Sequence, residues 1–207
     1  IPWDIPHAAR LISTGIIRRI ALGLAIPTGG NHSAALSQTG RYFLCVAGAG
    51  PDGALVNAVD EGLKKRAGQL AYWAEGARLL FRYSFPRIRV RSSGVERKAT
   101  IIVVGRTAHY GGPFKITTGA SLFEDSFEML TNSTRSRLRY IACLPALWFG
   151  KIRQMRGIET WKAAEVICEA NGTGLVYAQV DGEPIGPLPI IFRIVPDAIS
   201  LVTPAPH

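Results

Sequence analysis

The sequence has 207 residues, of which 47% are hydrophobic and 19% are charged. This balance excludes a disordered chain and a coiled coil, because both require far more charge. Lysine and arginine number 24 against 15 aspartates and glutamates, and the net charge of +9 favours an anionic partner. Nucleic acid, a phosphorylated cofactor and an anionic membrane surface all fit that description. No apolar run is long enough for a transmembrane helix.

The first third of the chain is expected to contain helices. Asp4 and Pro6 are typical of a helix start, and apolar residues then recur at helical spacing up to about Arg19. Strands are predicted next at 20–26 and 41–47, and the residues between them, 27–40, are expected to form a loop of small polar residues. Two further helical stretches are predicted, one from Ala54 and one at 68–83.

From Phe85 onward, short β-branched and apolar segments predominate, each bounded by glycine, proline or asparagine. A helix rich in arginine and aromatic residues is expected from Ser136 to about Lys151. The pattern predicts a mainly β protein with a few helices (α+β), built around a β-sandwich or a barrel-like core. The strands are predicted at 85–91, 98–107, 126–132, 160–169, 175–180, 188–195 and 198–203.

The segment from Gly48 to Gly53 matches Gly-x-Gly-x-x-Gly, which cradles a pyrophosphate in dinucleotide-binding folds. However, the following residues are helical and then antiparallel in character, and Pro51 stiffens the loop. A tight strand-to-helix turn, with Asp52 capping the helix, is therefore favoured over a phosphate cradle.

Two acidic pairs are candidates for chemistry. In Asp181-Gly182-Glu183 the Asp-Gly step predicts a hairpin turn, yet two carboxylates so spaced also suit proton transfer beside a metal-bound water. Glu124 and Asp125 form either a solvated loop or an oxygen site for Mg²⁺ that uses Asp125. From the residues alone, the turn and the solvated loop are favoured.

The basic residues concentrate in two groups, within 78–98 and 135–156. The second group is interleaved with aromatic residues, which suits an anionic membrane interface or single-stranded nucleic acid as well as a plain solvated face. No recognised nucleic-acid motif is present, so no nucleic-acid partner is expected. Three scattered cysteines, at 45, 143 and 168, favour a reducing compartment over a zinc site.

Four segments, in this order, resemble the diacylglycerol kinase catalytic-domain family, which also includes sphingosine kinases and bacterial lipid kinases. They are RYFLCVAGAGPDG (41–53), LKKRAGQLAY (63–72), YGGPFKIT with ASL (110–122) and VYAQVDGEP with LP (176–189). The resemblance implies the C-terminal β-sandwich lobe, of the NAD kinase/diacylglycerol kinase-like type, of an ATP-dependent lipid kinase. The family's Gly-Gly-Asp-Gly-Thr nucleotide loop is not in the sequence. We therefore expect 1–19 to be a helix connecting to a missing N-terminal nucleotide lobe, and 20–207 to be the β-sandwich lobe with inserted helices.

The resemblance also assigns site residues. Asp181 matches the proposed general base that accepts the proton of the lipid hydroxyl, and Glu183 matches its partner carboxylate in the metal-water network. Leu122, Asp125 and Phe127 match a Mg²⁺ site made by the Asp125 side chain and two backbone carbonyls. The implied cofactors are Mg²⁺ and ATP, with ATP held mainly by the missing lobe. These residue types suit phosphoryl transfer, which requires charge neutralisation and an oriented nucleophile.

The implied acceptor is diacylglycerol, a sphingoid base or a related lipid. We accordingly expect a cytoplasmic protein that is peripheral at the inner face of an anionic membrane, and an isolated chain that is inactive. Apolar surface left by the missing lobe would also support a homodimer. Two alternatives are an NAD kinase-like enzyme, which shares the two-lobe plan, and a non-catalytic β-sandwich that binds anionic membranes through its arginine-rich and aromatic helix.

Overall fold

The structure, a computed structural model, describes residues 4–29, 40–58, 82–110 and 114–204. Nearly half of these residues belong to two six-stranded sheets in which every pairing is antiparallel. The first sheet comprises β1 (Ile16–Pro27), β2 (Arg41–Phe43), β4 (Arg87–Ser92), β5 (Val95–Ala99), β11 (Glu165–Asn171) and β14 (Ile190–Thr203). The second comprises β3 (Val46–Ala49), β6 (Ile101–Gly105), β9 (Phe127–Asn132), β10 (Ile158–Ala163), β12 (Tyr177–Val180) and β13 (Glu183–Pro187).

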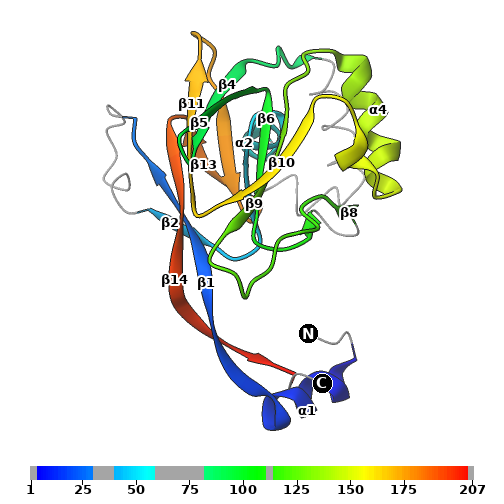
Figure 1. The fold of residues 1–207 in the computed structure, drawn as a ribbon, viewed down its shortest axis with the longest axis vertical. Helices are drawn as coiled ribbons and strands as arrows, with labels where there is room; N and C mark the ends of the chain where they lie inside the picture. The colour runs from blue at the N-terminus through cyan, green and yellow to red at the C-terminus, as the bar shows by residue number, and fades with distance from the viewer. Residues whose placement is uncertain (1–3, 30–39, 59–81, 111–113, 205–207) are drawn as a thin grey trace.

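The strand order is β2-β1-β14-β11-β4-β5 in the first sheet and β10-β9-β6-β3-β12-β13 in the second. The two sheets pack face to face as a sandwich (Figure 1). Successive side chains of a strand point to opposite faces of the sheet, so alternate residues form the inner face. In β4, Ile88 and Val90 are fully buried while Arg87 and Arg91 are exposed. The predicted fold class, mainly β with a few helices, is confirmed.

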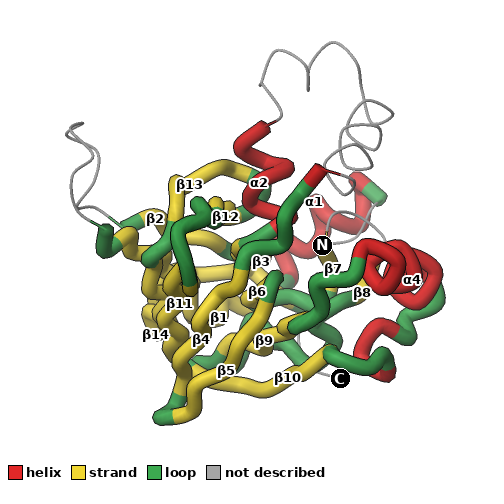
Figure 2. The backbone as a smooth tube through the Cα atoms, turned by 90° about the horizontal axis from the view of Figure 1, so that it is seen from above, coloured by secondary structure: helices red, strands yellow, loops and turns green. Residues whose placement is uncertain are grey.

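Three described helices accompany the sandwich: α1 (Ile5–Thr14), α2 (Pro51–Ala58) and α4 (Arg137–Trp148), with the short 3₁₀ helix η1 at Ile152–Gln154. Helix α4 and η1 cover the outer face of the second sheet, where Val103 and Leu130 contribute to a second apolar cluster (Figure 2). Strands β6 and β9 are therefore buried on both faces. Within the described residues, no helix is long and apolar enough to cross a membrane.

Strands β1 and β14 extend beyond the sandwich as a two-stranded ribbon that ends at α1 (Figure 1). The structure corrects the first predicted boundary, because helix α1 ends at Thr14 and strand β1 already begins at Ile16. The apolar side chains there occur on extended backbone, and Ile17 is 75% exposed. The two strands predicted at 188–195 and 198–203 form one strand, β14, whose register against β1 shifts next to Ala21.

Three segments that we predicted as single strands each contribute to both sheets. Residues 41–47 divide between β2 and β3, 98–107 between β5 and β6, and 160–169 between β10 and β11. Apolar residues continue from Phe43 to Val46, and a single residue, Thr100 or Ala164, separates the two strands at the other breaks. The local pattern therefore did not reveal where the chain passes from one sheet to the other. The helix predicted at 68–83 falls mainly outside the described residues, as do most of the loop predicted at 27–40 and the segment 63–72 used for the resemblance.

Candidate functional site

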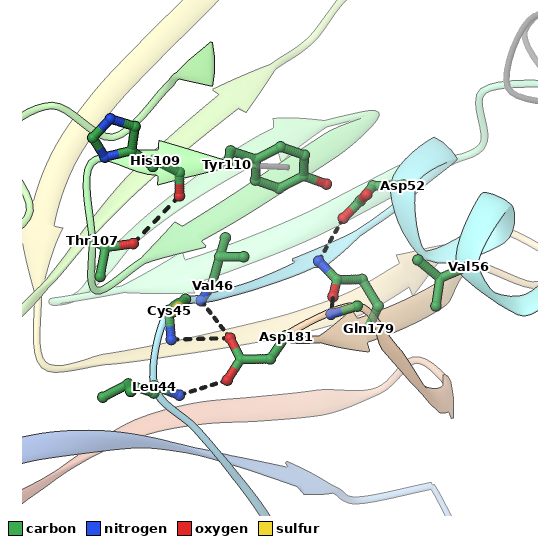
Figure 3. A pocket seen from close by; sticks show the side chains of 11 residues that line it. Leu44, Cys45, Val46, Asp52, Val56, Thr107, His109, Tyr110, Gln179 and Asp181 are labelled. Carbon is green, nitrogen blue, oxygen red and sulfur yellow. Dashed lines mark hydrogen bonds between the residues drawn. The ribbon is translucent and has the colours of Figure 1, made fainter. Parts of the chain in front are cut away.

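A cavity of about 520 Å³ opens beside β3 and β12 (Figure 3). Its walls come from four places: the link between β2 and β3, the first turns of α2, the residues after β6, and the β12–β13 turn. These segments lie far apart in the sequence and meet because β3 pairs with β12 on one edge and with β6 on the other. The antiparallel sheet therefore assembles the cavity.

The β12–β13 turn contains the first acidic pair. Asp181 (φ +46°) and Gly182 (φ +83°) both have left-handed backbone, and Val180 pairs with Glu183 across the turn. This is the two-residue hairpin that an Asp-Gly step favours. The turn favoured from the residues is therefore confirmed, and its first residue also lines the cavity.

The Asp181 carboxylate holds the link between β2 and β3. Its Oδ2 accepts a hydrogen bond from the Leu44 N–H at 2.7 Å, and its Oδ1 accepts from the Cys45 and Val46 N–H groups at 2.9 and 2.8 Å (Figure 3). The Asp181 N–H in turn donates to the Val46 carbonyl at 2.8 Å. These bonds explain why 41–49 is two strands, because the N–H groups at the break are paired to a carboxylate instead of a sheet neighbour.

Glu183 has a different environment. It is the first residue of β13, about half exposed, and its Oε2 lies 3.6 Å from Nη2 of Arg41, which is also about half exposed. An exposed ion pair of this kind contributes little to stability. Of the two predicted catalytic carboxylates, that of Asp181 lines the cavity, whereas Glu183 comes directly after Gly182, the last cavity-lining residue of the turn.

A buried amide links the turn to α2. Gln179 is 2% exposed; its Nε2 donates to Oδ2 of Asp52 at 2.8 Å, and its Oε1 accepts the Gly182 N–H at 2.8 Å. Burial raises the pKa of Asp52, while hydrogen bonding by Tyr110 and Gln179 acts in the opposite direction. The sequence analysis did not assign Gln179 a function; the available signal was a polar residue inside an apolar strand, two positions before Asp181.

The glycine-rich segment 48–53 is a tight turn between β3 and α2, as favoured from the residues. Asp52 was predicted to cap the helix, but it lies inside α2, which begins at Pro51, and its carboxylate accepts from Gln179. The Gly50 N–H donates to the Tyr177 carbonyl at 3.1 Å, and a Cβ on Gly53 would lie 2.1 Å from that same oxygen. The glycines therefore allow α2 to approach β12 closely. The neighbouring strands are antiparallel, unlike those of a dinucleotide-binding unit.

Arg106 follows β6 and is completely buried. Its Nη1 donates to the carbonyl oxygens of Ser121, Glu124 and Ser126 at 3.2, 2.6 and 2.8 Å, and its Nη2 donates to those of Leu122 and Ala21 at 2.9 and 3.0 Å. Burial lowers the pKa of this guanidinium, whereas the charges of Asp125 and Glu124 raise it. The second acidic pair therefore belongs to a loop that is wrapped around a buried cation.

The profile of the YegS C-terminal NAD kinase beta sandwich-like domain matches residues 45–203. The chain belongs to this family. A search among curated proteins returns no match. Among solved structures, three from Bacillus anthracis str. Sterne that are assigned as diacylglycerol kinases resemble the chain. Their TM-scores are 0.68, 0.65 and 0.59, at 15%, 14% and 13% identity. The match covers 98% of this chain but only 60–62% of theirs, so the chain spans less than two thirds of their length.

Membership of the YegS C-terminal family makes the chain a β-sandwich domain of the NAD kinase-like type, as the resemblance implied. For such a domain the resemblance placed Mg²⁺ at Leu122, Asp125 and Phe127. The described residues contain no group of three or more histidine, cysteine or acidic side chains that could hold a metal. Asp125 is exposed, Phe127 begins β9 with its ring stacked on Phe43, and the Leu122 carbonyl already accepts from Arg106. A divalent cation at these residues would have to share the Leu122 carbonyl with the Arg106 guanidinium.

Cys45 is the remaining reactive group at the cavity. Its thiol is exposed, and burial of its surroundings, followed by the negative charge of Asp181, raises its pKa, while a hydrogen bond with Thr107 lowers it. The thiol is therefore protonated at neutral pH and is a weak nucleophile. Cys168, by contrast, is fully buried in the sandwich core of this YegS-type domain.

Proposed function

We propose that this chain is the acceptor-side lobe of an ATP-dependent lipid kinase. The full protein would transfer the γ-phosphate of ATP to a hydroxyl of diacylglycerol, a sphingoid base or a related lipid. The observation that supports the proposal is the β12–β13 turn, in which Asp181 lines a cavity and Glu183 follows two residues later, in a domain of the YegS C-terminal family. ATP with its Mg²⁺ would be bound mainly by a nucleotide lobe outside this chain.

The resemblance assigned the general base to Asp181, but the surroundings of the two carboxylates lead us to propose Glu183 for that role instead. Both oxygens of Asp181 accept backbone N–H groups, so Asp181 shapes the cavity wall and fixes the turn. The Glu183 carboxylate is about half exposed, with Nη2 of Arg41 at 3.6 Å from Oε2, so solvent and a substrate hydroxyl can reach it. In the proposed reaction the lipid hydroxyl oxygen attacks the γ-phosphorus, the bond to ADP breaks, and Glu183 accepts the hydroxyl proton.

A lipid kinase assay on the full-length protein tests this assignment. Glu183→Gln should lower turnover by about 100-fold or more, because positioned proton transfer contributes that much, while the unfolding midpoint stays unchanged. The matched control is Glu96→Gln, since Glu96 is also about half exposed and lies 3.7 Å from an arginine, but on the distant strand β5. Full turnover in Glu183→Gln would refute its role as base. A midpoint that rises with NAD and not with lipid would favour the NAD kinase-like alternative.

A second candidate function, membrane attachment, is supported by α4. This helix has no buried residue, and its exposed side includes large apolar side chains next to arginines that suit the headgroups of an anionic bilayer. The exposed apolar residues here are Leu138, Leu144, Trp148 and Phe149, and the neighbouring basic residues are Arg135, Arg137 and Arg139.

Sedimentation with phosphatidylglycerol vesicles tests the role of α4. Trp148→Ser should reduce binding, because Trp148 is 70% exposed at the end of the helix, whereas Val95→Ser, at an exposed position on β5, should not. Equal binding by both variants would contradict a membrane contact at α4. Vesicle binding by a full-length protein without kinase activity would instead support the non-catalytic membrane-binding alternative.

A further inference from the structure

The loop 121–126 is organised around one side chain, Arg106. Four of its carbonyl oxygens accept from the two Nη atoms of Arg106, at 2.6–3.2 Å, and a fifth acceptor comes from Ala21 of β1. The Nε atom is buried and finds no partner among the described residues, so all of the hydrogen bonding of this guanidinium is concentrated at its charged end.

Converging carbonyl oxygens are the usual environment of a bound metal ion. Mg²⁺ takes six oxygen ligands and Ca²⁺ six to eight, drawn from backbone carbonyls, carboxylates and water. Here five carbonyls converge on a single positive charge, with the exposed Asp125 close enough to raise the pKa of the guanidinium. Apart from the Ala21 carbonyl, this oxygen set comes from one short loop, as a metal-binding loop would provide it.

The guanidinium and a divalent ion would compete for the same oxygens. An ion held at about 2.1 Å by the Leu122 carbonyl would lie within about 5 Å of Nη2, since that nitrogen is 2.9 Å from the same oxygen. Arg106 cannot release its proton in a protein, so the two positive charges would repel each other in a site with little water.

From this geometry we infer that Arg106 takes the place of a divalent cation in this domain, so that the 121–126 loop is formed and held without metal. The inference goes beyond the proposed reaction and does not depend on it.

The built-in cation also links parts of the domain that surround the cavity. The backbone N–H of Arg106 donates to the Cys45 carbonyl at 2.9 Å, in the β2–β3 link whose N–H groups donate to Asp181. The Ala21 carbonyl lies where the register of β1 against β14 shifts, so Arg106 also anchors the base of the ribbon. Phe123 of the loop then packs under the Arg18 guanidinium at 3.8 Å. Arg106 is therefore a positioning residue for both the cavity wall and the ribbon.

Thermal unfolding of the full-length protein without nucleotide tests the inference. The unfolding midpoint should be the same in excess MgCl₂, in excess CaCl₂ and in EDTA at matched ionic strength. Asp125→Asn should not change this result, because Asp125 holds no metal in the native protein. A midpoint that rises with MgCl₂ or CaCl₂ in the wild type, and no longer rises in Asp125→Asn, would overturn the inference.

The variant Arg106→Ala provides a readout that a purely structural role would not change. It removes the guanidinium and leaves the five carbonyls facing an open space, so its midpoint should fall in EDTA and recover in part with MgCl₂ or CaCl₂. Adding Asp125→Asn to this variant should abolish the recovery. A folded Arg106→Ala protein with no metal response would show that the loop does not form a cation site, and would overturn the proposed equivalence. If Arg106→Ala does not fold, the wild-type and Asp125→Asn titrations decide the question alone.

Discussion

The substitution Asp181→Asn tests whether a carboxylate holds the cavity wall. In the native turn three backbone N–H groups, from Leu44, Cys45 and Val46, donate to its two oxygens at 2.7–2.9 Å. Asparagine tolerates left-handed backbone as well as aspartate does, so the turn itself is not disturbed. Its single oxygen can retain the Cys45 and Val46 N–H groups, but its NH₂ group would face the Leu44 N–H.

The magnitude follows from the bonds that change. Hydrogen bonds to a charged group contribute about 1.5–3 kcal/mol and neutral ones about 1 kcal/mol. One charged bond is lost and two become neutral, and the exposure of Asp181 reduces the total, so we expect a loss of about 2 kcal/mol. For a domain of this size that corresponds to a fall in the unfolding midpoint of roughly 4–8 °C.

Differential scanning calorimetry measures this fall. The matched control is Asp197→Asn, because Asp197 also has left-handed backbone (φ +49°) and its carboxylate accepts no backbone N–H from the described part of the chain. The control should change the midpoint by less than about 2 °C. Equal midpoints for Asp181→Asn and the wild type would refute the reasoning. Kinase assays of Asp181→Asn must therefore be run well below its unfolding midpoint, whereas Glu183→Gln requires no such precaution.

Three further predictions concern the same region. Burial raises the folded-state pKa of Asp52 above 3.8, so the native protein loses stability as pH rises through that pKa. In urea unfolding, the free energy of unfolding of Asp52→Asn should therefore increase relative to that of the wild type above about pH 4. Free energies of unfolding that depend on pH in the same way in both proteins would contradict this. The raised pKa of Cys45 should delay its alkylation by iodoacetamide to higher pH than that of free cysteine, and Asp181→Asn should shift the profile to lower pH, as followed by mass spectrometry. Gly53→Ala should lower the free energy of unfolding by about 1–3 kcal/mol, because the new Cβ would lie 2.1 Å from the Tyr177 carbonyl oxygen. A calorimetric increase in stability, as the higher helix propensity of alanine alone would produce, would refute this packing argument.

The sequence alone determined the fold class and the family. Alternation around Ile88 and Val90 and the β-branched segments later in the chain predicted a β-sandwich or a barrel-like core, because side chains alternate between the two faces of a strand. The family resemblance narrowed this to the sandwich. The Asp181-Gly182 step predicted its hairpin, because the left-handed turn requires such residues. These features depend on local backbone preferences, which neighbouring residues are sufficient to specify.

Only the tertiary structure decided the points where the chain changes sheet and the roles of the charged groups. The break after Phe43 depends on a carboxylate more than 130 residues away. The break at Thr100 depends on the Asn132 and Thr134 carbonyls, both of which accept from the Thr100 hydroxyl. Apolar residues continue from Phe43 to Val46, and only Thr100 separates β5 from β6, so the local sequence gives no signal of these breaks.

Arg106 illustrates the same limit. Its position after an apolar strand gave no indication that it would be fully buried among carbonyl oxygens, and the resemblance assigned one of the facing oxygens, the Leu122 carbonyl, to Mg²⁺. Backbone carbonyls occur at every residue, so which of them converge on one point is set by the path of the chain and not by residue identity. For that reason the sequence specified the sandwich, whereas the folded chain alone decided which cation its acidic loop surrounds.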